Sequence, residues 1–232
     1  MKIFLAADWV NLILVSWKAS PAVLEPHLPD GTRLDDYHGD VFISFVAFEF
    51  RNTRVWGLKV PFHVNFPEIN LRFYVKVNGK RGVVFIRELV PSPAIALVAR
   101  WLYNEPYVSC SMQAISDVSE ASIRVRHTFR HKGKQYRVEV VGTNAPIIPG
   151  TESLEHFLKE HDLGYGKSRA GNILTYRVEH PQWSTYSIQE YRCDVDFGEV
   201  YGSKWSFLSS QEPANVLLAR GSEVKVFEPV GE

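Results

Sequence analysis

Cysteine is scarce in this chain of 232 residues, which contains only Cys110 and Cys193. Two widely separated cysteines form neither a paired-cysteine metal motif nor a disulfide framework. Cys110 alternates with Val108 and Met112, and this apolar setting predicts a buried, unreactive thiol. No His-Glu-x-x-His segment occurs either. The sequence therefore predicts no metal site and no cofactor.

An excess of charge is also lacking. Lys and Arg number 26, as do Asp and Glu, so the formal net charge is zero. Such a chain has no global field that attracts nucleic acid or an anionic membrane. We expect neither as a partner. The basic residues that do cluster surround one predicted hairpin tip, where charge runs are usually solvated. They are Arg124, Arg126, His127, Arg130, His131, Lys132 and Lys134.

Long apolar runs and phosphate-binding loops are missing as well. The N-terminal stretch Met1 to Val15 is interrupted by Lys2, Asp8 and Asn11. It is too short to span a bilayer and has no small-residue cleavage site, so we expect a cytoplasmic protein. No glycines have the spacing of a phosphate loop, and no serine lies in a glycine elbow. A nucleotide loop and a hydrolase triad are therefore unsupported.

Strand patterns dominate what is present. The pattern predicts roughly ten strands joined mainly by hairpins, and three small helices near residues 20–28, 94–103 and 151–161. Dense apolar residues predict that the helix at 94–103 is largely buried, and residues 204–208 read as a short strand. We expect one α+β, mostly β domain over residues 1–232. Its antiparallel sheet should curve or close into a barrel around a cavity, because closure removes exposed edges.

One predicted strand, Phe66 to Val77, organises the rest of the chain. It is rich in β-branched and aromatic residues, and an Asn78-Gly79 turn closes it. Alternate side chains share a face, so one face is apolar and the other polar. The polar face consists of Glu68, Asn70, Arg72 and Tyr74, spaced roughly 7 Å apart. It is either a solvated outer face or the lining of a pocket.

Lys18 and His180 are further candidates outside this strand. Lys18 follows an apolar strand, where a lysine usually extends its amine to solvent. If it stays inside, it needs a carboxylate such as Glu68, and its amine then suits anion binding or a Schiff base. His180 precedes Pro181 at a strand end, and either lies in the pocket or is a structural hydrogen-bonding group.

The stretch Phe66 to Val75 resembles the signature of the YqjF-like family, domain of unknown function 2071. Other stretches agree with that family, and the resemblance covers about residues 9 to 205. They are Ser16-Trp17 with Pro21 and Leu28-Pro29, Trp101 to Tyr107, and Tyr176 to Pro181. The family is similar in fold to acetoacetate decarboxylase. The resemblance thus implies a curved, mostly antiparallel sheet around a cone-shaped cavity, with small helices outside.

In the decarboxylase, a lysine forms a Schiff base with the ketone of a β-keto acid, and it follows a Tyr-Gly-x-Pro pattern. The matching stretch here is Tyr103 to Pro106, and Tyr107 and Val108 stand where two lysines belong. A phenol forms no imine, so the resemblance implies that decarboxylation by this route is absent. The decarboxylase's pocket arginine falls at Lys18, and its pocket glutamate falls at Glu68.

Three functions remain open at this stage. In the first, a pocket binds a small carboxylate or other oxyanion, and Glu68 acts as acid, base or acceptor. The ligand-binding set would be Lys18, Glu68, Asn70, Arg72, Tyr74, Tyr107 and His180. In the second, Lys18 carries out imine chemistry on a keto acid. In the third, the protein is a non-catalytic structural or interaction protein with a filled cavity, which a pocket below about 300 Å³ near Glu68 would favour. A homodimer is expected by analogy with the fold alone.

Overall fold

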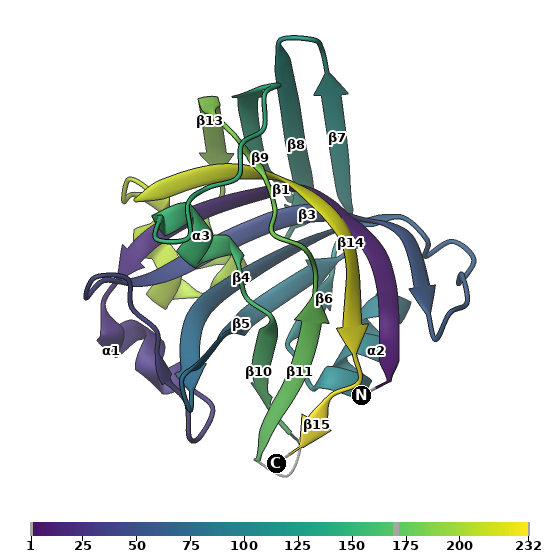
Figure 1. Ribbon diagram of the computed structural model, residues 1–232, viewed down its shortest axis with the longest axis vertical. Coiled ribbons are helices and arrows are strands. Elements are labelled where there is room, and N and C mark those ends of the chain that lie inside the picture. Colours follow the sequence, from purple (N-terminus) through teal and green to yellow (C-terminus); the bar gives the residue numbers. More distant parts are fainter. Residues whose placement is uncertain (1, 169–171, 232) are drawn as a thin grey trace.

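The computed structural model describes residues 2–168 and 172–231 and has two sheets. The larger sheet is strongly curved, and the smaller sheet lies above it in the view of Figure 1. The larger sheet contains eleven strands of the described chain, and the smaller contains four. The strands of the larger sheet are β1 (Ile3–Ala19), β2 (Arg33–Leu34), β3 (Val41–Val55), β4 (Phe66–Val77), β5 (Lys80–Val90), β6 (Tyr107–Ser109), β10 (Leu163–Lys167), β11 (Ile173–Glu179), β12 (Thr185–Tyr186), β14 (Asn215–Phe227) and β15 (Val230–Gly231). The strands of the smaller sheet are β7 (Met112–Val118), β8 (Ser122–His131), β9 (Lys134–Thr143) and β13 (Ile188–Asp194).

The larger sheet runs in the order β12-β14-β1-β3-β4-β5-β10-β11-β15. Strand β11 also pairs with β14, where Val178 faces Val226, so the hydrogen-bonded path returns to β14. Most pairings are antiparallel, as expected, but β5 pairs in parallel with β6 and with β10. The β5–β6 pair is parallel because a helix follows β5 and returns the chain to the end of the sheet where β5 began. Strand β6 then runs in the same direction as β5. The fold is thus mostly β, with short helices outside the strands.

Strand β4 is buried on both faces. Its apolar side chains Ile69, Leu71 and Phe73 are fully buried in one core cluster together with Val125 and Val138 of the smaller sheet. The smaller sheet therefore packs on the outer face of β4. The polar alternate residues of β4 point to the concave inner face, where a second core cluster lies. This arrangement brings the polar row inside the molecule.

The helices are short. They are α1 (Pro21–Leu24), α2 (Pro93–Tyr103), α3 (Leu154–Lys159), α4 (Phe197–Tyr201) and the 3-10 segments η1 (Glu25–His27) and η2 (Ser203–Ser209). The Ser92 side chain caps α2 by accepting from the backbone N–H of Ala94, and Asn104 ends it with a φ of 52°. Within residues 2–168 and 172–231, no helix is long and apolar enough to cross a membrane.

Three element predictions were wrong. The three predicted helices did not include α4, which the structure has at residues 197–201. The helix predicted to be buried exposes 64% of both Leu97 and Trp101, because only its Ala96 side meets the core. The strand predicted at residues 204–208 is the 3-10 segment η2. Its buried residues, Trp205 and Leu208, are three apart, which matches the repeat of a 3-10 helix.

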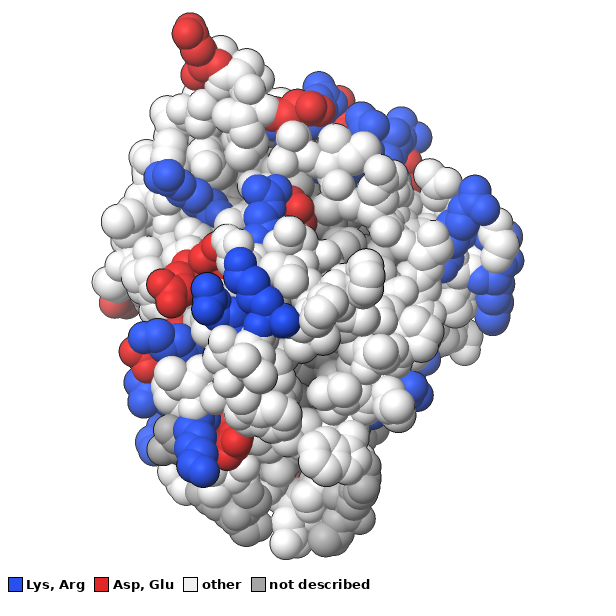
Figure 2. All heavy atoms as spheres, turned by 90° about the vertical axis from the view of Figure 1, so that its right-hand side faces the viewer, with Lys and Arg blue, Asp and Glu red and all other residues white. Residues whose placement is uncertain are grey.

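Charged residues are mixed in sign on the face of the molecule that Figure 2 shows. Figure 2 shows Lys and Arg in separate groups, with Asp and Glu among them and broad uncharged areas between. This distribution agrees with the formal net charge of zero.

Close packing of β10 on β11 provides a stability test. Gly164 faces Tyr176 across these strands, and a Cβ on Gly164 would collide with the Tyr176 ring. We expect Gly164→Ala to lower the free energy of unfolding by about 1–3 kcal/mol, measured by urea denaturation. Gly150→Ala is the control, because open space surrounds Gly150. Equal denaturation midpoints for the two variants would contradict this packing.

Candidate functional site

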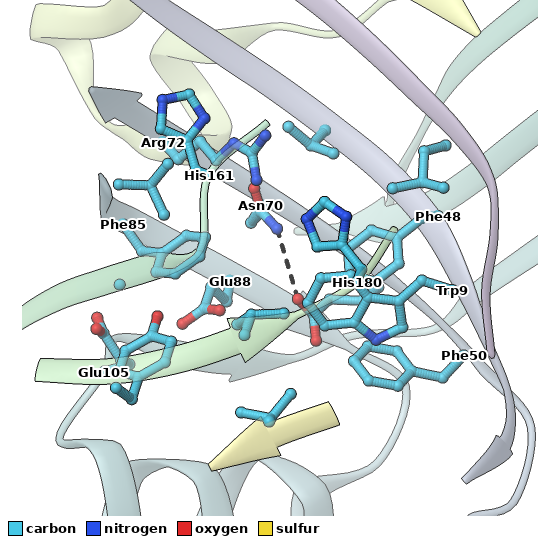
Figure 3. Close-up of a pocket in the computed structure, with 18 of the residues that line it drawn as sticks. Trp9, Phe48, Phe50, Asn70, Arg72, Phe85, Glu88, Glu105, His161 and His180 are labelled. Carbon is cyan, nitrogen blue, oxygen red and sulfur yellow. Dashed lines mark hydrogen bonds between the residues drawn. The ribbon is translucent and has the colours of Figure 1, made fainter. Parts of the chain in front are cut away.

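A pocket of about 110 Å³ lies on the concave face. Most of its wall is aromatic or aliphatic, and Trp9, Phe48 and Phe50 form one side (Figure 3). The volume is below the roughly 300 Å³ of ordinary ligand sites. A cavity of about 150 Å³ holds benzene, so this pocket has room for about four to six non-hydrogen atoms. Its size meets the criterion set above for a filled cavity, and it restricts any ligand to a small one.

Five of the predicted site residues line this pocket. They are Glu68, Asn70, Arg72, Tyr107 and His180. Glu68 is 4% exposed and Asn70 is 2% exposed. The polar row of β4 is therefore not a solvated outer face.

Tyr74, the fourth member of the row, does not line the pocket. Its hydroxyl donates to the Leu158 carbonyl at 3.0 Å and lies 2.5 Å from the Ser44 hydroxyl. Its ring packs on His161, with 4.9 Å between ring centroids. Tyr74 thus holds α3 against the sheet, and its polar group is already used.

Lys18 does not reach the pocket either, which corrects its assignment as a ligand-binding or imine-forming residue. Its Nζ lies 2.6 Å from Asp40 Oδ2, and 56% of its side chain is exposed. Lys18 alternates with Leu12, which does line the pocket, but it stands at the far end of β1. There the amine extends to water and to a surface carboxylate.

One end of the pocket presents N–H donors. Arg72 Nη2 donates to the Leu158 carbonyl at 3.2 Å, whereas its Nε is buried without a partner among the described residues. Arg81 donates to His161 Nε2 at 3.3 Å, so the ring hydrogen is on Nδ1. Burial and the charge of Arg81 hold the pKa of His161 well below its ordinary value. His161 Nδ1 is likewise buried and unpartnered within the described chain.

The other end presents carboxyl groups. Burial raises the pKa of Glu68 and of Glu105 to about 8. Burial, and then the charges of Glu68 and Glu105, raise the pKa of Glu88 well above its ordinary value. The Tyr107 phenol hydrogen-bonds to Glu68 and Glu88. Figure 3 draws Glu88 and Glu105 at one side of the pocket, and Arg72 and His161 at another.

A bulge in the β4–β5 hairpin brings Glu88 into the pocket. Arg72 pairs with Phe85, but Leu71 pairs with Arg87, so one extra residue lies in β5. The slip moves each later side chain of β5 to the opposite face. Glu88 consequently pairs with Asn70 on the concave side. The sequence analysis missed Glu88 because nothing in the residues marks this bulge.

Glu105 was missed although it lies in the Tyr103 to Pro106 stretch that carries the family resemblance. The Oε1 atom of Glu105 lies against Gly166, and a Cβ on residue 166 would collide with this oxygen. A parallel pairing sets Tyr107 beside Glu88. The chain that follows α2 therefore supplies both Glu105 and Tyr107 to the acid end.

A buried lysine was missed as well. Lys159 lines the pocket, its side chain is 0% exposed, and its Nζ pairs with Glu160 Oε1. Glu160 Oε1 also accepts from the Trp183 backbone N–H at 3.1 Å. His180 stacks on Trp183 with 4.0 Å between ring centroids, and its Nδ1 is 3.8 Å from Glu160 Oε2. Only its place at the end of the predicted helix 151–161 distinguished Lys159 in the sequence.

Residues 6–223 match the profile of domain of unknown function 2071, described as an uncharacterized conserved protein. The chain belongs to this family. A relative, the uncharacterized protein YqjF of Bacillus subtilis (strain 168), is 28% identical over 207 residues, which cover 88% of this chain and 83% of the relative.

Solved structures place this family member among acetoacetate decarboxylase-like folds. An acetoacetate decarboxylase-like enzyme from Sphingomonas wittichii RW1 matches with a TM-score of 0.68 and 12% identity, covering 100% of this chain and 94% of that one. Acetoacetate decarboxylase from Legionella pneumophila matches with 0.67 and 9%, covering 98% and 86%. The enduracididine biosynthesis enzyme MppR, complexed with pyruvate, matches with 0.66 and 11%, covering 100% and 91%. At these identities the likeness concerns the fold.

The carboxyl end of the pocket predicts a pH dependence of stability in this family member. A carboxyl whose pKa is raised by folding binds its proton more tightly in the folded state. Its contribution to stability is therefore fully present below its ordinary pKa and is lost as the pH rises toward about 8. Glu105→Gln removes one such group. Between pH 5 and 8 we expect this variant to gain stability relative to wild type by up to about 1.4 kcal/mol per pH unit.

Urea denaturation at several pH values measures this difference. Glu120→Gln serves as the control, since Glu120 is exposed and its loss should leave the pH dependence as in wild type. Parallel pH curves for wild type and Glu105→Gln would show that Glu105 is ionised in the folded protein.

Proposed function

We propose that this protein binds a small carboxylate or another oxyanion in the pocket, with Arg72 and His161 as its donors. The observation that carries the proposal is the pair of unpartnered N–H groups, Arg72 Nε and His161 Nδ1, in a pocket with mostly apolar walls. Buried donors without partners are costly. A ligand oxygen that accepts from both would remove this cost.

Charge supports an anion in particular. Within residues 2–168 and 172–231, no carboxylate forms an ion pair with Arg72. The raised pKa values of Glu68 and Glu105 leave these groups largely neutral at pH 7. A guanidinium binds a carboxylate through two parallel hydrogen bonds. The ligand would therefore supply the counter-charge.

Size and fold relatives suggest which anions to test. The pocket of about 110 Å³ suits a short acid. MppR, which shares the fold, forms a complex with pyruvate. Short keto acids and simple fatty acids are therefore the first probes. In such a complex the neutral carboxyl of Glu68 is available as a general acid.

A filled cavity is the less favoured reading, even though the pocket is small. Side chains that fill a cavity for structural reasons satisfy one another's hydrogen bonds. Here Arg72 Nε, His161 Nδ1 and Asn70 Oδ1 are buried without partners among the described residues. These groups support a site that is completed by a ligand or by ordered water.

Thermal unfolding with propionate and pyruvate tests the proposal. At a ligand concentration 100 times its Kd, we expect a stabilisation of about 2.7 kcal/mol. Arg72→Lys keeps the charge but loses the fork of N–H donors, and should weaken binding at least about tenfold. Arg130→Ala is the control, because Arg130 is exposed. No shift with any short anion, or equal shifts in the Arg72 and Arg130 variants, would refute the proposal.

Imine chemistry on a keto acid is a second candidate, and the buried position of Lys159 in the pocket favours it. Glu160 is placed to take a proton from Lys159 Nζ. The free amine would then attack the ketone carbon, and water would leave as the imine forms. This route replaces the one assigned above to Lys18, whose amine pairs with Asp40 at the surface.

Borohydride trapping with pyruvate distinguishes the two lysines. We expect a mass increase at Lys159 that is lost in Lys159→Arg. The Lys18→Arg variant should be modified to the same extent as wild type, since Lys18 is outside the pocket. An unmodified Lys159 under conditions where pyruvate binds would exclude imine chemistry and leave the binding proposal intact.

A further inference from the structure

Strand β7 forms an edge of the smaller sheet. The strand order there is β13-β9-β8-β7, so no strand of the described chain pairs with the outer side of β7. Figure 1 shows β7 and β8 projecting beyond the curved larger sheet. We propose that β7 pairs antiparallel with β7 of a second copy of this chain, which joins two sheets of four strands across a two-fold axis. This inference concerns another surface than the pocket and does not depend on the proposed function.

The two edges of the smaller sheet differ in how they are protected. Edge strands are normally kept from pairing by bulges, prolines or charged residues. The edge strand β13 has a register shift between Ile188 and Glu190, and it carries the charged residues Glu190, Arg192 and Asp194. Strand β7 pairs with β8 without any shift. Its sequence, Met-Gln-Ala-Ile-Ser-Asp-Val, has one charged residue and no proline. Strand β7 is therefore suited to accept a further strand.

The hydrogen bonds to β8 show which backbone groups of β7 are free. The Arg130 N–H donates to the Ser111 carbonyl, and the Ser119 N–H donates to the Ser122 carbonyl. Hydrogen-bonded and non-hydrogen-bonded pairs alternate along an antiparallel ladder. The odd-numbered residues from 111 to 119 therefore turn their backbone groups toward β8. The even-numbered residues turn their N–H and carbonyl groups to the open side, and these are Met112, Ala114, Ser116 and Val118.

These free groups restrict the register of a second β7. Even-numbered residues must lie opposite even-numbered residues, because only they have free backbone groups. A register centred on Ile115 meets this condition over the whole strand, with Met112 opposite Val118 of the second copy and Ala114 opposite Ser116. Each such pair exchanges two hydrogen bonds, so the symmetric ladder would form about eight. A register centred on Ala114 or Ser116 also meets the condition, but it leaves the end of each strand unpaired.

In the register centred on Ile115, the side chains of β7 are complementary to themselves. Ile115, which is 42% exposed, would pack on its own symmetry mate, and Val118, which is 65% exposed, would pack on Met112. Gln113 would lie opposite Asp117, whose carboxylate forms no ion pair among the described residues. The Gln113 amide can donate to that carboxylate. Such cross-strand pairs stabilise a sheet, and this complementarity favours a second copy over an unrelated partner.

The direction of β7 leaves room for both copies. Met112, at the start of the strand, packs against the core, whereas Val118, at its end, is largely exposed. Antiparallel pairing therefore places the larger sheets of the two copies at opposite ends of the joined strands. A strand of seven residues makes a small interface, so we expect the dimer to dissociate on dilution.

Sedimentation velocity of the full chain between about 5 and about 500 µM tests the inference. We expect the sedimentation coefficient to rise from that of a monomer to that of a dimer. Ile115→Lys would set two ammonium groups opposite each other at the axis, and should raise the dimer Kd at least about tenfold. Ile148→Lys is the matched control, because Ile148 is 64% exposed in a loop outside the smaller sheet. It should dimerise as wild type does.

Cysteine cross-linking tests the register. In a non-hydrogen-bonded antiparallel pair the Cα atoms are about 4.5 Å apart, which is within the range that a disulfide bridges. Ile115→Cys should therefore form a disulfide-linked dimer when it is oxidised with glutathione disulfide, as seen on a non-reducing gel. Gln113→Cys is the control on the same face, since its symmetry mate would lie roughly 13 Å away along the strand. Cys110 and Cys193 are present in both variants, so their background is shared.

Three results would refute the inference. The first is a wild-type chain that stays monomeric up to about 500 µM, a measurement that requires no variant and so cannot be confused with misfolding. The second is a dimer that is equally stable in Ile115→Lys and Ile148→Lys, which would place the interface on another surface. The third is cross-linking of Gln113→Cys that equals or exceeds that of Ile115→Cys, which would exclude a two-fold axis at residue 115.

Discussion

The carbonyl oxygens at the end of α3 control the geometry of the concave face. Arg81 donates to the Phe157 carbonyl, while Arg72 and Tyr74 donate to the Leu158 carbonyl. The last carbonyls of a helix have no partner within the helix. Side chains of β4 and β5 supply those partners here, and they hold α3 over the sheet. Lys159, the last residue of α3, and His161, which follows it, are thereby brought to the pocket.

These hydrogen bonds to the Phe157 and Leu158 carbonyls, here called the clamp, give the polar residues of β4 two different roles. Tyr74 has its hydroxyl engaged and serves the clamp. Arg72 uses one nitrogen for the clamp and keeps another for the pocket. Glu68 and Asn70 hydrogen-bond to each other at 3.5 Å, and both line the pocket. The row therefore changes, along a single strand, from side chains that hold α3 to side chains that line the pocket, in steps set by the strand repeat.

Alternation along β4 and its Asn78-Gly79 turn predicted the hairpin and the separation of a polar from an apolar face, because both are local properties. The pattern left open whether the polar face points to solvent or into a pocket, since that depends on what covers the sheet. Glu88 could not be predicted in the same way. In an uninterrupted hairpin, Arg87 would face Asn70, and the bulge in β5 puts Glu88 there instead. The bulge depends on packing across the sheets. For a similar reason Lys18 was assigned to the pocket. A strand pattern shows which face of the sheet a residue lies on, but not how far along the strand other elements cover that face.

Asn70 explains how the two ends of the pocket stay unpaired. Arg72 and Glu68 lie on one strand face, roughly 13 Å apart along the backbone, with Asn70 between them. The Asn70 amide donates to Glu68 at 3.5 Å, a long and weak bond. A charged residue at position 70 would pair with one end and cancel it. A neutral amide at this position cancels neither the positive charge of Arg72 nor the carboxyl groups, so both ends of the pocket keep unpartnered polar atoms within the described chain.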